Sequence, residues 1–146
     1  MRNIALKLMY VGTAYHGWQV QKNAKSVQGT VQAALLDVCG GDVTLTGCSR
    51  TDTGVHAEMF VCNFGSETRI PCDKLPPALN THLPEDVVCL FAEDVDSDFH
   101  SRYAAKKKRY TYYIQNSRFP DVFKINYAWH YSYPLDLDAM KKAADA

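Results

Sequence analysis

The sequence has no excess of charge of either sign, because 16 Lys and Arg residues balance 16 Asp and Glu residues. A uniform positive field, which draws many proteins to nucleic acids, is therefore missing, and any such binding must come from local clusters of cations. No apolar run approaches the roughly 20 residues of a membrane-spanning helix. A strand pattern follows directly after Arg2-Asn3, so we also expect no secretory signal.

Two common kinds of ligand site are also missing. The five cysteines are widely spaced and form no Cys-x-x-Cys pair, so we expect reduced, mostly buried thiols in a cytoplasmic protein and no metal site. Gly12 and Gly17 have the spacing of a phosphate loop. Trp18 and Gln19 follow where that loop needs Lys and Ser or Thr, so nucleoside triphosphate binding is excluded.

Hydrophobic periodicity predicts strands and helices in the order β-α-β-β-α-β. Ser26 is the expected N-cap of the first helix, and the pair Gly40-Gly41 is expected to end it. The order predicts an α+β fold of the ferredoxin-like (RRM-like) type, an antiparallel sheet with helices on one face. The expected strands are 4–10, 43–47, 58–64 and 87–92, and the expected helices are 27–39 and 71–81.

Further elements are expected beyond this pattern. Extra strands are predicted at 103–115 and 127–131, and a helix at 135–146 with Asp136 or Asp138 as its cap. That last helix runs to the end of the sequence without a C-cap or a basic last turn. We expect a chain that is cut short here, with a frayed natural terminus as the alternative.

The most informative segment is Ser49-Arg50-Thr51-Asp52-Thr53-Gly54-Val55-His56-Ala57, a polar loop between two predicted strands. Side chains two residues apart point to the same side of extended backbone, so Arg50 and Asp52 can meet there. The arginine would keep the carboxylate ionised. A single ionised carboxylate suits a nucleophile or a base. A surface ion pair or an Asx-turn is the structural alternative.

The only basic run, Lys106-Lys107-Lys108-Arg109, is followed at once by Tyr110, Tyr112 and Tyr113. Cations that follow phosphates and aromatic rings that stack on bases suit an RNA-binding surface. A solvated edge strand protected by lysines is the alternative. His56 and His100 have no serine or cysteine nucleophile near them in the sequence, so neither is predicted to be catalytic.

Together these segments resemble the tRNA pseudouridine synthase A family from Ile4 to the end of the chain. Ser49 and Thr53 stand where the family often has Gly and Ala. The matching blocks, in order, are Gly12-x-x-Tyr15-x-Gly17-Trp18-Gln19, Ser26-Val27-Gln28-Gly29, Arg50-Thr51-Asp52-x-Gly54-Val55-His56-Ala57, Asn80 with Leu83-Pro84, Phe99-His100-Ser101-Arg102, and Arg109-Tyr110-x-Tyr112.

The resemblance implies an isomerase that converts uridine to pseudouridine in the anticodon stem-loop of tRNA, around positions 38 to 40. It implies no cofactor and no metal. Asp52 would start bond cleavage as nucleophile or base, and Arg50 would hold it ionised. Tyr110 would stack on the target base, and the remaining substrate contacts would come from Arg109, Lys108 and His56.

The resemblance also implies a domain organisation. The family carries two ferredoxin-like halves, and residues 1–115 match the first, which holds the active-site aspartate. Residues 116–146 would be a connecting strand and a truncated helix leading to a missing second half. The implied complete protein is a cytoplasmic homodimer, and this chain alone would be inactive. The alternative is a non-catalytic RNA-binding module, because ferredoxin-like sheets host many functions.

Overall fold

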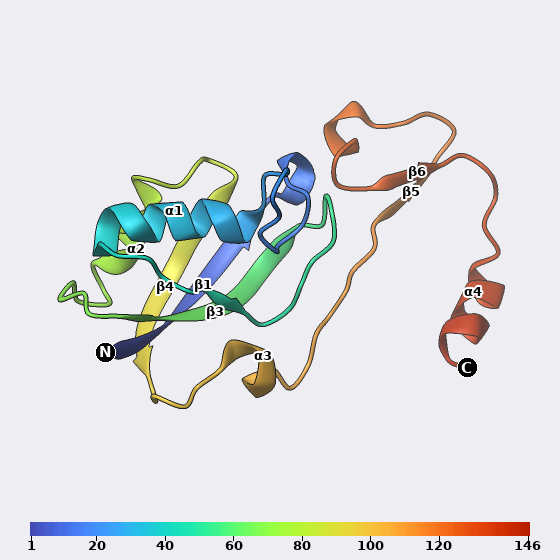
Figure 1. Cartoon of the computed structure of the whole chain (residues 1–146). Helices are drawn as coiled ribbons and strands as arrows, with labels where there is room; N and C mark the ends of the chain where they lie inside the picture. Colours follow the sequence, from blue (N-terminus) through green and yellow to red (C-terminus); the bar gives the residue numbers. More distant parts are fainter. The chain divides into compact units, whose positions relative to one another are not determined.

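A computed structural model describes all 146 residues, and the chain divides into two compact units, Met1–Lys107 and Lys108–Ala146 (Figure 1). No helix in either unit is long and apolar enough to cross a membrane.

The first unit is built on a four-stranded antiparallel sheet. Its strands are β1 (Arg2–Tyr10), β2 (Thr46–Gly47), β3 (Ala57–Ser66) and β4 (Val87–Val95), in the spatial order β2-β3-β1-β4. The central strand β1 pairs with both long neighbours, so Leu6 lies opposite Cys62 on one side and Ala92 on the other. The antiparallel sheet and the element order predicted from the sequence are both observed.

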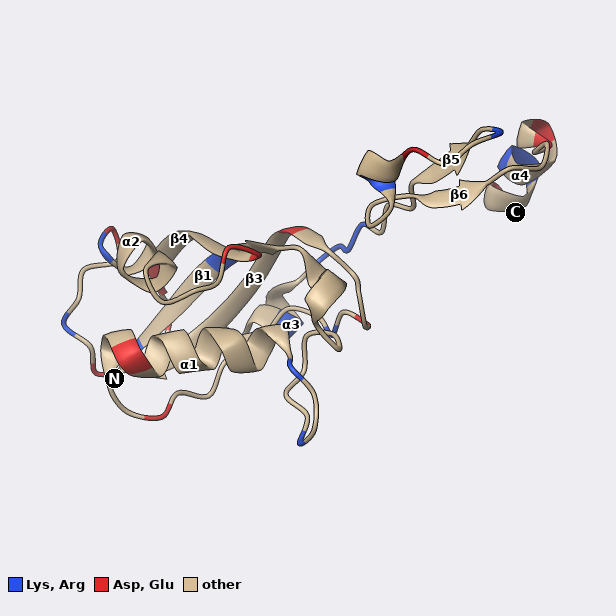
Figure 2. Ribbon diagram, turned by 90° about the horizontal axis from the view of Figure 1, so that it is seen from above, with Lys and Arg blue, Asp and Glu red and all other residues tan.

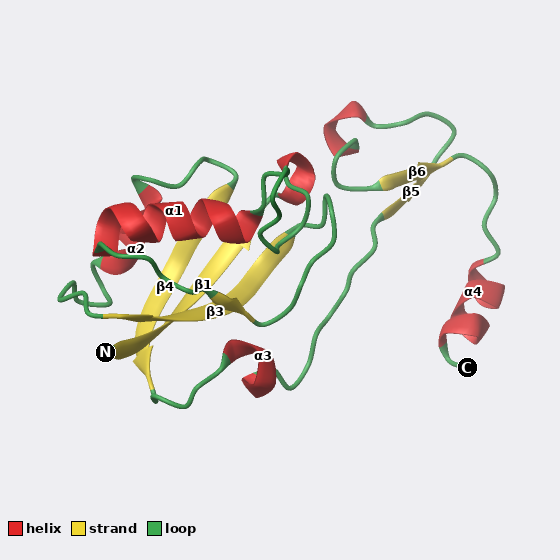
Figure 3. Cartoon of the chain, viewed as in Figure 1, coloured by secondary structure: helices red, strands yellow, loops and turns green.

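Two helices join these strands and lie on the same face of the sheet (Figure 3). Helix α1 (Val27–Cys39) begins at Ser26, whose Oγ accepts a hydrogen bond from the Gly29 amide at 3.2 Å, and it ends at Gly40. Gly40 has a φ of 68°, which a residue with a side chain rarely adopts. Helix α2 (Leu75–Asn80) is shorter than predicted, with prolines only in its first turn, where no amide donor is required.

The core lies between this helical face and the sheet. Alternate residues of β1 and β3 point into it, as expected for strands with one covered face. Helices α1 and α2 supply the opposite wall. The fully buried core side chains include Ile4, Leu6, Leu8, Val27, Val31, Leu35, Leu75 and Leu79.

The predicted strand at 43–47 is mostly not a strand, because only Thr46–Gly47 pairs with β3. Side chains of α1 bind backbone carbonyl groups that would otherwise accept hydrogen bonds from a neighbouring strand. The Nε2 amide of Gln32 donates to the Val43 carbonyl oxygen, and that of Gln28 donates to the Leu45 carbonyl oxygen, both at 2.8 Å. The segment therefore packs its apolar side chains against the helix instead of extending the sheet.

A short helix, α3 (Ser101–Ala104), lies against β2 and β3. It is fixed by Asn63, whose Oδ1 accepts from the Ser101 amide at 2.9 Å and from the Ser101 hydroxyl at 2.7 Å. Asn63 points away from the face that buries Cys62 and Phe64, because neighbouring strand residues alternate. Helix α3 is therefore on the face of the sheet opposite to α1 and α2.

The predicted strand at 103–115 is wrong over most of its length. Its first residues belong to α3, residues 105–113 have no regular structure, and only β5 (Ile114–Asn116) is a strand. Tyrosines at 110, 112 and 113 suit a strand, but a strand also needs a neighbour that takes its backbone hydrogen bonds.

In the second unit, β5 pairs in parallel with β6 (Trp129–Tyr131). Between them lies the short 3₁₀ helix η2 (Val122–Lys124), and α4 (Leu137–Ala144) follows β6. The side chain of Asp136 accepts from the Ala139 amide at 2.9 Å, so Asp136 is the cap of α4.

Candidate active site

Asp52 stands at the first position of a tight turn between β2 and β3. Its carbonyl oxygen accepts a hydrogen bond from the Val55 amide at 3.2 Å, which closes the turn. Gly54, the third turn residue, has a φ of 78°, whereas Thr53, like every non-glycine residue here, has no positive φ. This combination defines a type II turn, in which glycine is favoured at the third position. The carboxylate of Asp52 is exposed to solvent.

A second loop, residues 11–19 after β1, holds this turn in place on both sides of Asp52. Before the aspartate, the Trp18 amide donates to the Thr51 carbonyl oxygen at 3.0 Å. After it, the Gly54 amide donates to the Tyr15 carbonyl oxygen at 3.2 Å. Backbone hydrogen bonds on both flanks hold the main chain of Asp52 in a fixed position, while its carboxylate is exposed.

Glycines allow these two loops to approach so closely. A Cβ on Gly12 would lie 2.0 Å from the Val55 carbonyl oxygen, and a Cβ on Gly17 would lie 2.5 Å from the Thr51 carbonyl oxygen. Real Cβ atoms do not come this near to backbone oxygens. Gly17 also has a φ of 82°, so its conformation and its contact both require glycine.

Two tyrosines anchor the interlocked loops to the rest of the unit. The Tyr10 hydroxyl lies 2.8 Å from the Thr51 hydroxyl, next to the aspartate. Tyr15 is 1% exposed, and its hydroxyl donates to Oδ1 of Asp86 at 2.6 Å. Burial, together with this bond to a carboxylate, raises the pKa of Tyr15. The phenol therefore stays a neutral donor and acts as a structural support.

His56 also belongs to this framework. Its Nδ1 accepts a hydrogen bond from the Gly12 amide at 2.9 Å. The half-buried ring therefore joins the end of the turn to the loop after β1. A contact to substrate, as predicted, would have to use other atoms of the ring.

Arg50 and Asp52 do not meet as expected. No ion pair joins them, although both side chains are exposed. Arg50 instead lines a depression of about 210 Å³ together with His100 and Arg102 from the α3 region. The rule that places residues two apart on one side of extended backbone does not hold here, because the bonds of Thr51 fix the chain between them.

His100 and Arg102 were not predicted as site residues, although both lie in a segment that resembles the family. They belong to this depression because Asn63 holds α3 against the sheet. That contact links residues far apart in the chain, so no local pattern reveals it.

The other three predicted substrate contacts lie in the second unit. Lys108, Arg109 and Tyr110 form part of an extended stretch, and the Tyr110 side chain is 60% exposed. In Figure 2 the ribbon between α3 and β5 is coloured blue where Lys and Arg residues stand. Exposed cations beside an exposed aromatic ring are able to contact an RNA strand.

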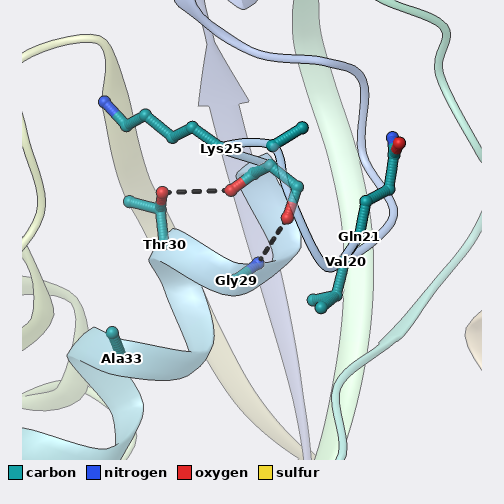
Figure 4. A pocket seen from close by; sticks show the side chains of 8 residues that line it. Val20, Gln21, Lys25, Gly29, Thr30 and Ala33 are labelled. Atoms are coloured by element: carbon teal, nitrogen blue, oxygen red, sulfur yellow. Dashed lines mark hydrogen bonds between the residues drawn. The ribbon is translucent and has the colours of Figure 1, made fainter.

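A second depression, of about 360 Å³, lies at the start of α1 (Figure 4). The polar groups at the first turn of α1 are already used within the protein. Ser26 accepts from the Gly29 amide through its side chain, and its carbonyl oxygen accepts from the Thr30 hydroxyl at 3.0 Å. It contains no carboxylate or imidazole, so it has no group for acid-base chemistry.

The cysteines are free thiols, and two of them, Cys62 and Cys89, are fully buried. Burial raises the pKa of Cys62 and raises that of Cys89 to about 11, so both are poor nucleophiles. No three His, Cys, Asp or Glu side chains are grouped as metal ligands.

Comparison with known proteins identifies relatives of the whole chain. The sequence profile of a family described as tRNA pseudouridine synthase matches residues 7–104. Proteins named tRNA pseudouridine synthase A from Thermoanaerobacter sp. (strain X514) and Acetivibrio thermocellus are 54% and 49% identical to it over 144 residues. These alignments cover 99% of this chain and 59% of each relative. The chain therefore spans about three fifths of the length of these relatives.

Proposed function

The chain belongs to the tRNA pseudouridine synthase family, and from this we propose that it carries the catalytic aspartate of an enzyme that isomerises uridine to pseudouridine in tRNA. The proposed target is the anticodon stem-loop, around positions 38 to 40, as the resemblance implies. Asp52 is the proposed nucleophile or base.

The observation that carries this proposal is the setting of Asp52. Its carboxylate is exposed on a turn whose backbone is fixed on both flanks by the loop after β1. A reacting group must be both reachable and held in position, since small displacements of catalytic groups reduce rates strongly. A turn that served only to connect two strands would not need two glycines pressed against backbone oxygens.

The proposed reaction needs no external reagent. The bond from C1′ of the ribose to N1 of uracil breaks, the base rotates, and a bond from C1′ to C5 forms. C5 loses a proton and N1 gains one, so atoms and electrons balance within the substrate. Asp52 is suited to open this sequence, either by attack or by proton transfer, and no metal or redox cofactor takes part in the proposed chemistry.

The target base must leave its stack before Asp52 can reach it. Extrusion of a paired base costs a few kcal/mol. Stacking on an aromatic ring recovers about 1–3 kcal/mol per base. We assign that stacking to Tyr110, and contacts to neighbouring phosphates to Arg109 and Lys108, which are all exposed. Arg50 is proposed as the second catalytic residue, and His56 is proposed to complete the substrate-contacting set.

We further propose that the first unit has the ferredoxin-like fold, in a catalytic half that extends to about residue 115. Its strand order β2-β3-β1-β4, with α1 and α2 on one face, supports this assignment. Residues 116–146 are proposed to connect it to a second half, because the relatives are longer than this chain. The complete protein is proposed to be a cytoplasmic homodimer, and this chain alone is expected to show little activity.

A non-catalytic RNA-binding module is the second candidate. The exposed stretch of cations and tyrosines after α3 would serve either function. An exposed carboxylate on a rigid turn favours catalysis, because a negative charge beside RNA phosphates weakens binding unless it serves the reaction.

The test is pseudouridine formation on unmodified tRNA, measured for the complete natural protein and for this chain side by side. Asp52→Asn should abolish turnover and leave the dissociation constant for tRNA within a fewfold of wild type. Asp42→Asn, which removes another exposed carboxylate of the same unit, is the matched control and should retain turnover. Near-normal turnover by Asp52→Asn contradicts the role assigned to Asp52. If the complete wild-type protein binds tRNA but shows no turnover, the binding module is the better account.

A further inference from the structure

We infer that the depression between Arg50, His100 and Arg102 is a binding site for one phosphodiester group of the RNA substrate. The depression has a volume of about 210 Å³. Pockets for whole drug-sized ligands measure about 300–1,000 Å³. A single phosphate group with its water suits this space better than a complete nucleotide does. The inference rests on the proposed function for the identity of the RNA.

The charges that line the depression are all of one kind. Arg50 and Arg102 are two guanidinium groups, His100 adds an imidazole, and no carboxylate takes part in the lining. Neither arginine has a hydrogen bond or an ion pair within the protein, so their donors are available. Two cations that share one concavity repel each other, and a bound anion would remove that repulsion. The planar donor fork of arginine matches the oxygens of a phosphate.

His100 contributes a second, independent indication. Its Nδ1 is buried and has no hydrogen-bond partner, while its ring stacks on Tyr103 with ring centres 4.3 Å apart. An unpaired buried polar atom is a cost to the folded protein and often marks a functional position. His100 also lines the basic depression, so a side chain with an unsatisfied ring nitrogen belongs to the proposed site.

The walls of the depression are formed before any ligand arrives. The Nε2 and Oε1 atoms of Gln28 are bonded to the Leu45 carbonyl oxygen and the Val20 amide, at 2.8 and 3.0 Å. The Trp18 indole packs against Gly47, where a Cβ would lie only 2.7 Å from the ring. A preformed site loses less entropy on binding than one that must assemble.

The position of the depression connects it with Asp52. Arg50 precedes the aspartate by two residues, and two residues of chain span at most about 7 Å. A phosphate held by Arg50 would therefore belong to the same stretch of RNA as the nucleoside presented to the carboxylate. The site would fix the register of the RNA strand, since phosphate contacts position a nucleic acid and carry no sequence information.

The test compares Arg102→Gln with Arg69→Gln, in the complete natural protein. Arg69 is an exposed arginine of the same unit outside the depression, so its loss controls for overall charge. The dissociation constant for an unmodified tRNA is measured between about 50 and 200 mM KCl, because each phosphate contact contributes roughly 0.7–0.9 to the slope of log K against log salt. Arg102→Gln should lower the slope by that amount and weaken binding about tenfold. Arg69→Gln should change neither.

Arg102→Lys separates charge from structure. It should keep the slope and most of the affinity. A loss of slope as large as in Arg102→Gln would mean that Arg102 acts by holding the fold, which overturns the inference. Thermal unfolding of each variant shows whether the α3 region remains folded.

A second measurement distinguishes RNA from free anions. Titration with inorganic phosphate is followed through the Arg102 Nε–H signal in NMR spectra. A response to inorganic phosphate with an unchanged salt slope for tRNA would make this a free-anion site and overturn the assignment to RNA. Pseudouridine formation by wild type is recorded in parallel. If wild type is active but Arg102→Gln has the same salt slope as wild type, only the phosphate site is rejected. If wild type forms no pseudouridine, only the proposed function is rejected.

Discussion

Substitution of Gly17 by alanine should destabilise the protein more than any other glycine-to-alanine change at positive φ. The residue has a φ of 82°, and its added Cβ would lie 2.5 Å from the Thr51 carbonyl oxygen. The left-handed conformation costs an alanine about 1–2 kcal/mol. Overpacking against a backbone oxygen adds about 1–3 kcal/mol. Separation of the loops would also lose the bond from the Trp18 amide to Thr51, worth about 1 kcal/mol.

Two other glycines separate these contributions. Gly41 has a φ of 74° and no atom within 4 Å of its added Cβ, so Gly41→Ala measures conformational strain alone. Gly12 has no positive φ, but its added Cβ would lie 2.0 Å from the Val55 carbonyl oxygen, so Gly12→Ala measures the clash. The expected losses of unfolding free energy are about 1–2 kcal/mol for Gly41→Ala, about 1–3 for Gly12→Ala and about 3–6 for Gly17→Ala.

Urea denaturation of the three variants under the same conditions provides these free energies, and equal m-values confirm that the unfolded states are comparable. The reduced flexibility of an unfolded chain with alanine in place of glycine is common to all three and cancels in the comparison. If Gly17→Ala were no less stable than Gly41→Ala, the close approach of the two loops would not constrain the turn of Asp52. The backbone that carries the Asp52 carboxylate would then not be held in a fixed position by the loop after β1.

Two further predictions concern the supports of the first unit. Asn63→Ala should lower the unfolding free energy by about 2–4 kcal/mol, because it leaves the buried Ser101 amide and hydroxyl without their acceptor. Hydrogen exchange at Ser101 should accelerate, whereas Asn23→Ala at an exposed position should change neither quantity; unchanged exchange in Asn63→Ala would contradict the docking of α3. Arg2 bonds to both oxygens of Asp94, at 2.7 and 2.8 Å, and these bonds lower the pKa of the Asp94 carboxyl. Because the folded pKa is lowered, the ionised carboxyl stabilises the protein above the unfolded pKa of about 4, and this stabilisation is lost as pH falls through the folded pKa. The difference in unfolding free energy between wild type and Asp94→Asn, measured by urea denaturation, should therefore become smaller from pH 7 to below pH 4. A difference that does not depend on pH would contradict the ion pair.

The sequence predicted those parts of the fold whose causes are local. Ser26 and the pair Gly40-Gly41 set the ends of α1 through a side-chain cap and a positive φ, both of which depend on residue type alone. The long strands β1, β3 and β4 followed from apolar alternation or from short apolar runs within each segment. The prediction of a strand at 43–47 was wrong over most of its length because the glutamines of α1 donate to its carbonyl groups. Such competition between two segments cannot be read from the hydrophobic periodicity of either one.

The candidate site shows the same division between local and distant causes. The turn at Asp52 was predictable, since Gly54 marks the third position of a type II turn within four consecutive residues. The direction of Arg50 was not, because it depends on what Thr51 bonds to and on where Asn63 places α3. Arg50 therefore faces the basic depression and forms no ion pair with Asp52. An arginine placed in this way is available to a phosphate of the substrate, and the carboxylate remains open to the nucleoside on which it is proposed to act.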